Sequence, residues 1–161
     1  LASDASQPEA LYYRGLLFEK LDDTRSATMM FLHVRESMLA LGPPPWTPNP
    51  ETVLMFADEA VKSLTGPGVD IISQASLYIV DLPGPEMIVD GVDVQTPILI
   101  EFTPESADSP GGFRVFLYLF NILRIASGLE NVQHCIQAAL ETELATLVEE
   151  LEQLGLETSV S

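Results

Sequence analysis

Two histidines and one cysteine are the side chains of this 161-residue sequence best suited to nucleophilic catalysis or transition-metal binding. His134 and Cys135 are neighbours in a predicted helix, so their side chains diverge by about 100° and cannot bind one metal ion together. Glu130 and His134 share a helix face, but two ligands are too few for a site. We interpret His33 as a partly buried structural histidine and Cys135 as a small core hydrophobe. We therefore expect no catalytic residue, cofactor or metal here.

Carboxylates are the second chemical candidate, because Asp81, Asp90, Asp93 and Glu101 could gather at the ends of a sheet. Paired carboxylates act as general acid and base or bind Ca²⁺. Their spacing matches no calcium loop, however, and Asp90 is explained by a turn. The segments TGPGVD and SPGGF lack the strand–turn–helix context and the lysine of a phosphate-binding loop. A carboxylate-dependent hydrolase is therefore the third of three functional hypotheses.

The net charge of −17, from 24 acids and seven bases, excludes several partners. Binding to nucleic acid or to an anionic membrane needs a patch of Lys and Arg, which this chain cannot supply. The longest apolar run, Val115 to Leu123, is far shorter than the ~20 residues of a membrane span. The single cysteine is compatible with the cytoplasm or another reducing compartment. A basic protein partner, a high-salt environment or simple solubility remains to explain the acids.

The acids concentrate in the last predicted helix, which has no Lys or Arg. Its leucines form a heptad-like seam with spacings of four and three, and the flanks of the seam are glutamates. One interpretation is that the seam packs on the protein's own sheet while the acids are merely solvated. The other is that this helix docks a partner, and the predicted interaction residues are then Leu144, Leu147, Leu151, Glu149, Glu150 and Glu152.

Helices with clear start signals are predicted in the first third of the sequence. Each start signal precedes a run of apolar residues at helical spacing, and Gly-Pro combinations end the second and third helices. The predicted starts are marked, in order, by a capping box of Ser6 with Glu9, by Asp23 or Thr24, and by Asn49 followed by Pro50.

Strands are predicted in the middle third. The segment Ser76 to Leu82 is rich in β-branched and aromatic residues, and Ile98 to Phe102 follows the same pattern. Between them, Asp90-Gly91 predicts a two-residue hairpin, because a type I′ turn needs positive φ at both central positions. That register would pair Val89 with Val92 and Met87 with Val94.

Residues 113–126 are ambiguous, because their first half alternates like a strand while the whole run could equally be a buried helix. We favour a central strand from Gly112 to about Leu119. Ser127 and Glu130 would then form a capping box that opens a long helix ending near Leu154.

Helices followed by strands and a final helix predict an α+β fold. We expect one domain over residues 1–161, with flexible ends at 1–5 and 156–161. Its N-terminal helices would accompany a small, mainly antiparallel sheet with a central hairpin, and the long C-terminal helix would pack on that sheet.

The leading functional hypothesis is a non-enzymatic protein–protein interaction module, either an acidic assembly subunit or a small chaperone-type binding protein. Its expected partner is a protein with a basic surface, or the Arg-bearing first helices of a neighbouring copy in a homo-oligomer. The alternative is a structural subunit of a larger particle such as a coat or shell.

Overall fold

The computed structural model describes residues 7–108 and 111–155. Its contacts divide the chain into two compact units, each with its own hydrophobic core. Unit 1 comprises Leu1–Pro45 and Asp81–Thr96, and unit 2 comprises Trp46–Val80 and Pro97–Ser161. One domain over residues 1–161 stays a prediction, and the ends expected to be flexible, 1–5 and 156–161, lie outside the described residues.

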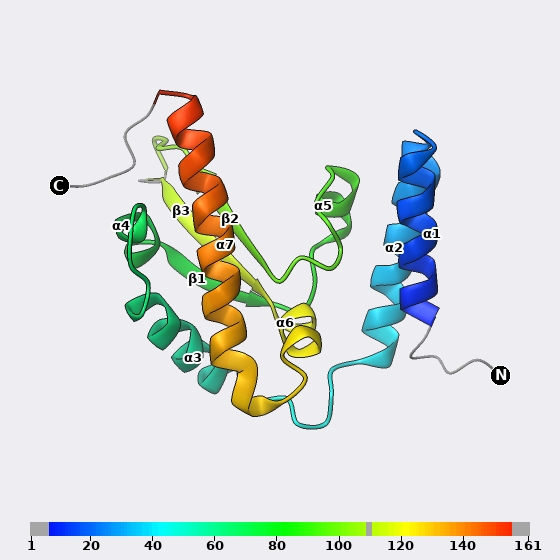
Figure 1. Cartoon of the computed structure of the whole chain (residues 1–161), viewed down its shortest axis with the longest axis horizontal. Helices are drawn as coiled ribbons and strands as arrows, with labels where there is room; N and C mark the ends of the chain where they lie inside the picture. The colour runs from blue at the N-terminus through cyan, green and yellow to red at the C-terminus, as the bar shows by residue number, and fades with distance from the viewer. Residues whose placement is uncertain (1–6, 109–110, 156–161) are drawn as a thin grey trace. The chain divides into compact units, whose positions relative to one another are not determined.

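Unit 1 is built on two helices that pack side by side, α1 (Gln7–Lys20) and α2 (Thr24–Leu41) (Figure 1). The predicted cap of α2 is confirmed, because Asp23 Oδ1 accepts a hydrogen bond from the Ser26 N–H at 3.1 Å. Ser6, the first residue of the capping box predicted for α1, lies outside the described residues. The core of unit 1 contains Val34 of α2 with Ile88 and Val94.

The hairpin predicted at Asp90-Gly91 is wrong, because this segment ends a short helix, α5 (Pro85–Val89). Gly91 has φ +104°, and its N–H donates to Ile88 O at 3.0 Å. The Val92 N–H donates to Met87 O at 2.9 Å, which completes the Schellman pattern of a helix C-terminus. A glycine with positive φ occurs at helix C-termini as well as in hairpin turns, and in this protein Gly91 follows the C-terminus of a helix.

Unit 2 contains a three-stranded mixed sheet with the strand order β1-β3-β2. Its strands are β1 (Ser76–Val80), β2 (Ile98–Thr103) and β3 (Gly112–Tyr118). The central strand β3 pairs in parallel with β1 and antiparallel with β2. The predicted strands are thus confirmed, although β1 ends two residues earlier than expected.

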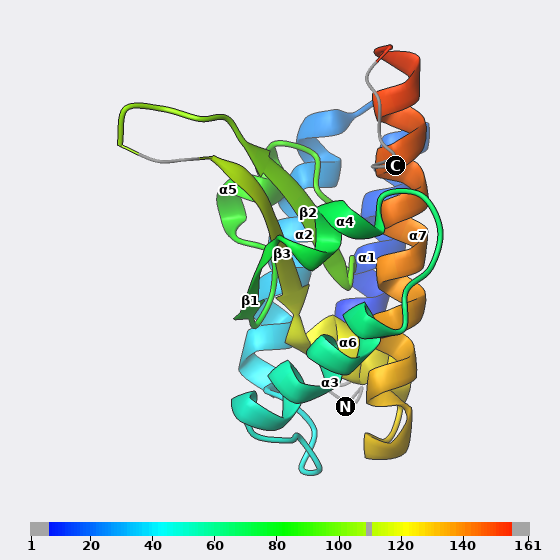
Figure 2. The ribbon, with the colours of Figure 1, turned by 90° about the vertical axis from the view of Figure 1, so that its left-hand side faces the viewer.

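Four α-helices of unit 2 accompany the sheet. They are α3 (Pro50–Lys62), α4 (Val69–Ser73), α6 (Leu119–Ala126) and α7 (Val132–Gln153). The predicted cap of α3 is confirmed, because the Thr52 N–H donates to Asn49 Oδ1 at 2.8 Å. Helix α7 runs along the sheet and contacts β2 and α3 (Figure 2). The fold is therefore α+β, with a small sheet and a long C-terminal helix packed on it, as predicted.

Residues 113–126 contain both of the structures that their sequence allowed. The alternating half forms β3, and the chain enters α6 directly at Leu119. The capping box predicted for Ser127 and Glu130 is wrong, because Ser127 ends α6 with φ +60°. A short 3-10 turn, Leu129–Asn131, follows and leads into α7, whose N-terminus has no side-chain cap.

Candidate functional site

The leucine seam of α7 changes its burial along the helix. Leu140 and Leu144 are buried in the core of unit 2, together with Val115 and Leu117 of β3. Leu147 and Leu151 are half-buried. Leu154, the residue after the helix, is 74% exposed. The seam therefore anchors the first part of α7 to the sheet, while the last two turns stand closer to solvent.

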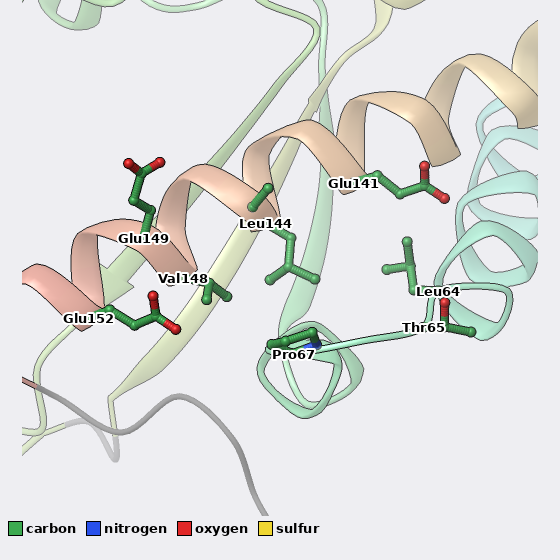
Figure 3. A pocket seen from close by; sticks show the side chains of 9 residues that line it. Leu64, Thr65, Pro67, Glu141, Leu144, Val148, Glu149 and Glu152 are labelled. Carbon is green, nitrogen blue, oxygen red and sulfur yellow. The ribbon is translucent and has the colours of Figure 1, made fainter.

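A groove of about 300 Å³ runs beside this C-terminal half of α7. Its opposite wall is the connection between α3 and α4 (Figure 3). We call it the α7 groove and define it by its lining residues, Leu64, Thr65, Pro67, Glu141, Leu144, Ala145, Val148, Glu149 and Glu152.

The α7 groove has an apolar floor with carboxylates along its helical wall. Leu144 and Val148 lie on the side of α7 that faces Pro67, and Glu141 and Glu152 flank them along the helix (Figure 3). Residues 141, 145, 148 and 152 follow one another at steps of four, three and four, so they form one stripe on the helix. One acid therefore lies at each end of a short apolar surface.

Gly68 allows the opposite wall to approach α7 so closely. It has φ +85° and begins α4, which lies at the end of the connection that lines the groove. A Cβ atom at this position would lie 2.8 Å from Val148 Cγ2 and 2.9 Å from Leu144 Cδ1. Both the backbone conformation and the space thus require glycine.

The carboxylates of the α7 groove are exposed. Among the described residues, no Lys, Arg or His lies within ion-pair distance of Glu149 or Glu152. Unit 2 carries 14 of the 24 acids but only three of the seven bases. Of those bases, Lys62 is 3.4 Å from Asp58, and Arg114 pairs with Glu101. The negative potential of α7 is therefore not neutralised locally.

Three of the six predicted interaction residues meet in the α7 groove: Leu144, Glu149 and Glu152. Leu147 and Leu151 belong to the half-buried part of the seam and do not line the groove. Glu150 does not line the groove. Burial raises the pKa of Glu143, and the negative charge of Glu150 raises it further. The predicted set therefore divides between two sides of α7.

Six groove residues are absent from the predicted interaction set: Leu64, Thr65, Pro67, Glu141, Ala145 and Val148. Glu141 and Val148 could have been found, because they continue the helical stripe that contains Glu152. The wall formed by residues 64–67 had no such signal, since its segment reads only as the end of a helix.

Cys135 is buried, whereas both histidines are exposed. Cys135 is buried, its thiol donates to Ile122 O at 3.6 Å, and burial raises its pKa, which lowers its reactivity. His33 was predicted to be partly buried, but it is exposed and its Nδ1 lies 3.8 Å from Glu36 Oε2. His134 is also exposed. Within the described ranges, no three His, Cys, Asp or Glu side chains are grouped to hold a metal ion.

The four carboxylates considered for catalysis belong to different units. Asp93 accepts hydrogen bonds from the Tyr12 hydroxyl and the Gln95 N–H, both at 2.9 Å, within unit 1. Asp90 ends α5, and Asp81 is exposed. Glu101 pairs with Arg114 across the β2–β3 ladder of unit 2. Hydrogen bonding, capping and cross-strand pairing thus account for three of the four.

None of the described helices combines the length and the apolar composition needed to cross a membrane. No known protein family, curated protein or solved structure matches this chain.

Proposed function

We propose that the protein is a non-enzymatic interaction module whose α7 groove binds a basic, amphipathic segment of another protein. The observation that supports this proposal is the stripe on α7, in which Leu144 and Val148 form an apolar floor between Glu141 and Glu152. Such a surface matches a ligand that has apolar side chains in its centre and Lys or Arg on either side.

The two parts of this surface would contribute differently to binding. Burial of apolar side chains on the floor would supply affinity, at roughly 25 cal/mol per Å² of apolar area before the costs of association. The carboxylates are exposed, so they would mainly accelerate association and exclude acidic competitors. Removal of these charges should therefore slow binding more than it speeds dissociation.

An assembly subunit or a chaperone-type protein would use such a groove to hold an exposed helix of its partner. A helical ligand presents apolar residues at steps of three and four, the same period as the stripe on α7. Both roles place the function in reversible recognition and need no reactive side chain.

The direct test is a titration of the full chain into a fluorescent peptide of about 15 residues that is amphipathic as a helix, with leucines on one face and lysines beside them. Its control is a peptide of the same composition in scrambled order. We expect binding of the amphipathic peptide that is several-fold weaker for the Glu141→Gln/Glu152→Gln variant at about 0.05 M salt, with the difference narrowing at about 0.5 M salt.

A matched control variant is Glu105→Gln/Asp108→Asn, which removes two exposed charges from the β2–β3 loop. It should bind the peptide as the unmodified chain does. Equal binding to all three proteins, or to both peptides, would show that the α7 groove is not the binding site.

A further inference from the structure

We infer that the amphipathic segment taken by the α7 groove is helix α1 of a second copy of this chain. The inference rests on the proposed function and names its partner. Three features of α1 support this contact: its exposed apolar face, the orientation of that face within unit 1, and the charges beside it.

Helix α1 carries an exposed apolar stripe. Tyr13 and Leu17 of α1 and Leu21, the residue that follows this helix, are 61%, 58% and 66% exposed, and they follow one another at steps of four residues. The Leu21 N–H donates to Leu17 O at 3.2 Å, so Leu21 continues the helical row. Three large apolar side chains exposed in one row are unusual on a small protein and typically mark an interaction surface. At 1.5 Å per residue, the row is about 12 Å long, against about 16 Å from Glu141 to Glu152 on α7.

The stripe lies on the side of α1 that faces away from α2. Gly15 is buried against α2, because a Cβ atom added to it would overlap the ring of Phe31. Tyr13 and Leu17 are each two residues from Gly15, so they point about 160° away from it around the helix. The packing of α1 on α2 therefore leaves the stripe largely exposed, with the ring of Tyr13 in edge-on contact with the neighbouring Tyr12.

The charges beside the stripe complement those of the α7 groove. Arg14 and Lys20 are exposed and lie on the two flanks of the row formed by Tyr13, Leu17 and Leu21. Glu19 is two residues from Leu17 and from Leu21, which places it on the opposite half of the helix. Glu9 is one turn before Tyr13, at the end of the row. An apolar row between two bases thus matches an apolar floor between acids.

Each copy has one such stripe and one such groove. A reciprocal exchange between two copies closes a dimer, whereas a one-way contact continues from copy to copy into a ring or a filament. The net charge of −17 opposes every such assembly at long range. We therefore expect association at about 0.15 M salt, where charges farther apart than ~8 Å are largely screened.

A charge exchange between full chains tests the contact. Arg14→Glu/Lys20→Glu makes the flanks of the α1 stripe acidic, and Glu141→Lys/Glu152→Lys makes the groove basic. Sedimentation velocity over a range of concentrations should show that the unmodified chain self-associates. Each double variant alone should associate at least tenfold more weakly, and an equimolar mixture of the two should regain the association.

Matched controls make the same charge changes at exposed residues that belong to neither surface. Arg25→Glu/Arg124→Glu is the control for the α1 variant, and Glu105→Lys/Asp108→Lys is the control for the groove variant. All four replaced residues are exposed. Each control should associate within about threefold of the unmodified chain, because long-range charge is screened at this salt concentration.

A variant with unchanged net charge separates a loss of association from a loss of folding. Leu17→Gln removes one exposed apolar side chain and leaves the net charge unchanged, so it should melt like the unmodified chain yet associate several-fold more weakly. Unchanged self-association in this variant and in both charge variants would overturn the inference, and so would a mixture that fails to regain association.

The failure of this inference differs from the failure of the proposed function. A chain that stays monomeric at every concentration but binds the lysine–leucine peptide in its groove overturns the α1 contact and leaves the groove function standing. A chain that is monomeric and also ignores the peptide overturns both. If α1 occupied the groove of its own chain, the protein would likewise be monomeric, and the contact between copies would be refuted.

Discussion

Replacement of Gly68 by Ala would perturb the place where the α3–α4 connection meets α7. The new Cβ atom would stand 2.8 Å from Val148 Cγ2 and 2.9 Å from Leu144 Cδ1, well inside normal contact distance. Leu144 is 5% exposed, so it has little room to move. We therefore expect the connection to shift outward or the core beneath it to repack, with a loss of stability in either case.

The magnitude follows from three contributions. A side chain at φ +85° costs about 1–2 kcal/mol in the left-handed region. Overpacking costs about 1–3 kcal/mol. The lower entropy of the unfolded Ala chain offsets about 0.4–1 kcal/mol of this. The expected decrease in the free energy of unfolding for Gly68→Ala is therefore about 1–5 kcal/mol.

Gly66→Ala is the matched control, because Gly66 has φ +98° but no atom within 4 Å of its added Cβ. It shares the conformational and entropic contributions and lacks the steric one. Urea unfolding followed by circular dichroism should thus give a difference of about 1–3 kcal/mol between the two variants. Val148→Ala, added to each, should reduce that difference because it removes the nearest methyl group.

An equal loss of stability in Gly66→Ala and Gly68→Ala would refute the reasoning. It would mean that Gly68 is required only for its backbone conformation, and that the wall of the α7 groove does not depend on close approach. A difference that persists in the Val148→Ala background at full size would point to Leu144 alone as the obstacle.

Three further outcomes follow from burial, charge and backbone conformation. Leu140→Ala should lower the free energy of unfolding by about 2–5 kcal/mol, whereas Leu154→Ala should change it by less than ~0.5 kcal/mol, both measured in urea. Burial and the charge of Glu150 raise the pKa of Glu143, so its ionised form is unfavourable in the folded state. Glu143→Gln should therefore raise the melting temperature at pH 7, and the gain should vanish as the pH falls below the ordinary carboxyl pKa of about 4. Gly91→Ala should lower the free energy of unfolding by about 1 kcal/mol through strain at φ +104°, and an unchanged melting curve would contradict the helix end.

Local signals in the sequence predicted the parts of the fold that local chemistry decides. Asn49 and Asp23 cap their helices with their own side chains, which is a property of a few neighbouring residues. The hairpin predicted at Asp90-Gly91 was wrong, because a positive φ at Gly91 is compatible with both a hairpin turn and a helix C-terminus. The choice between them depends on Ile88, which packs in the core of unit 1 against distant residues. Tertiary contacts therefore select the helix end, and a local sequence pattern does not reveal such contacts.

Only the α7 side of the candidate site could be predicted from the sequence. Leu144, Glu149 and Glu152 stand out in the sequence, because the absence of bases in α7 is visible in the letters alone. The facing wall comes from Leu64 and Pro67, about 80 residues earlier, and its approach depends on Gly68. No spacing rule connects positions so far apart, so the groove became visible only in the folded chain.

Unit 1 takes its core from two separate stretches of the polypeptide, since Val34 packs with Ile88 and Val94. During synthesis on a ribosome, the α1–α2 hairpin emerges long before its partners from Asp81–Thr96. At roughly 5–20 residues per second, the delay is about 3–10 s. For that interval the apolar surface of the nascent hairpin has nothing of its own to cover it, and it is open to capture by chaperones. For the same reason no single cleavage of the chain separates the whole of unit 1 from the whole of unit 2.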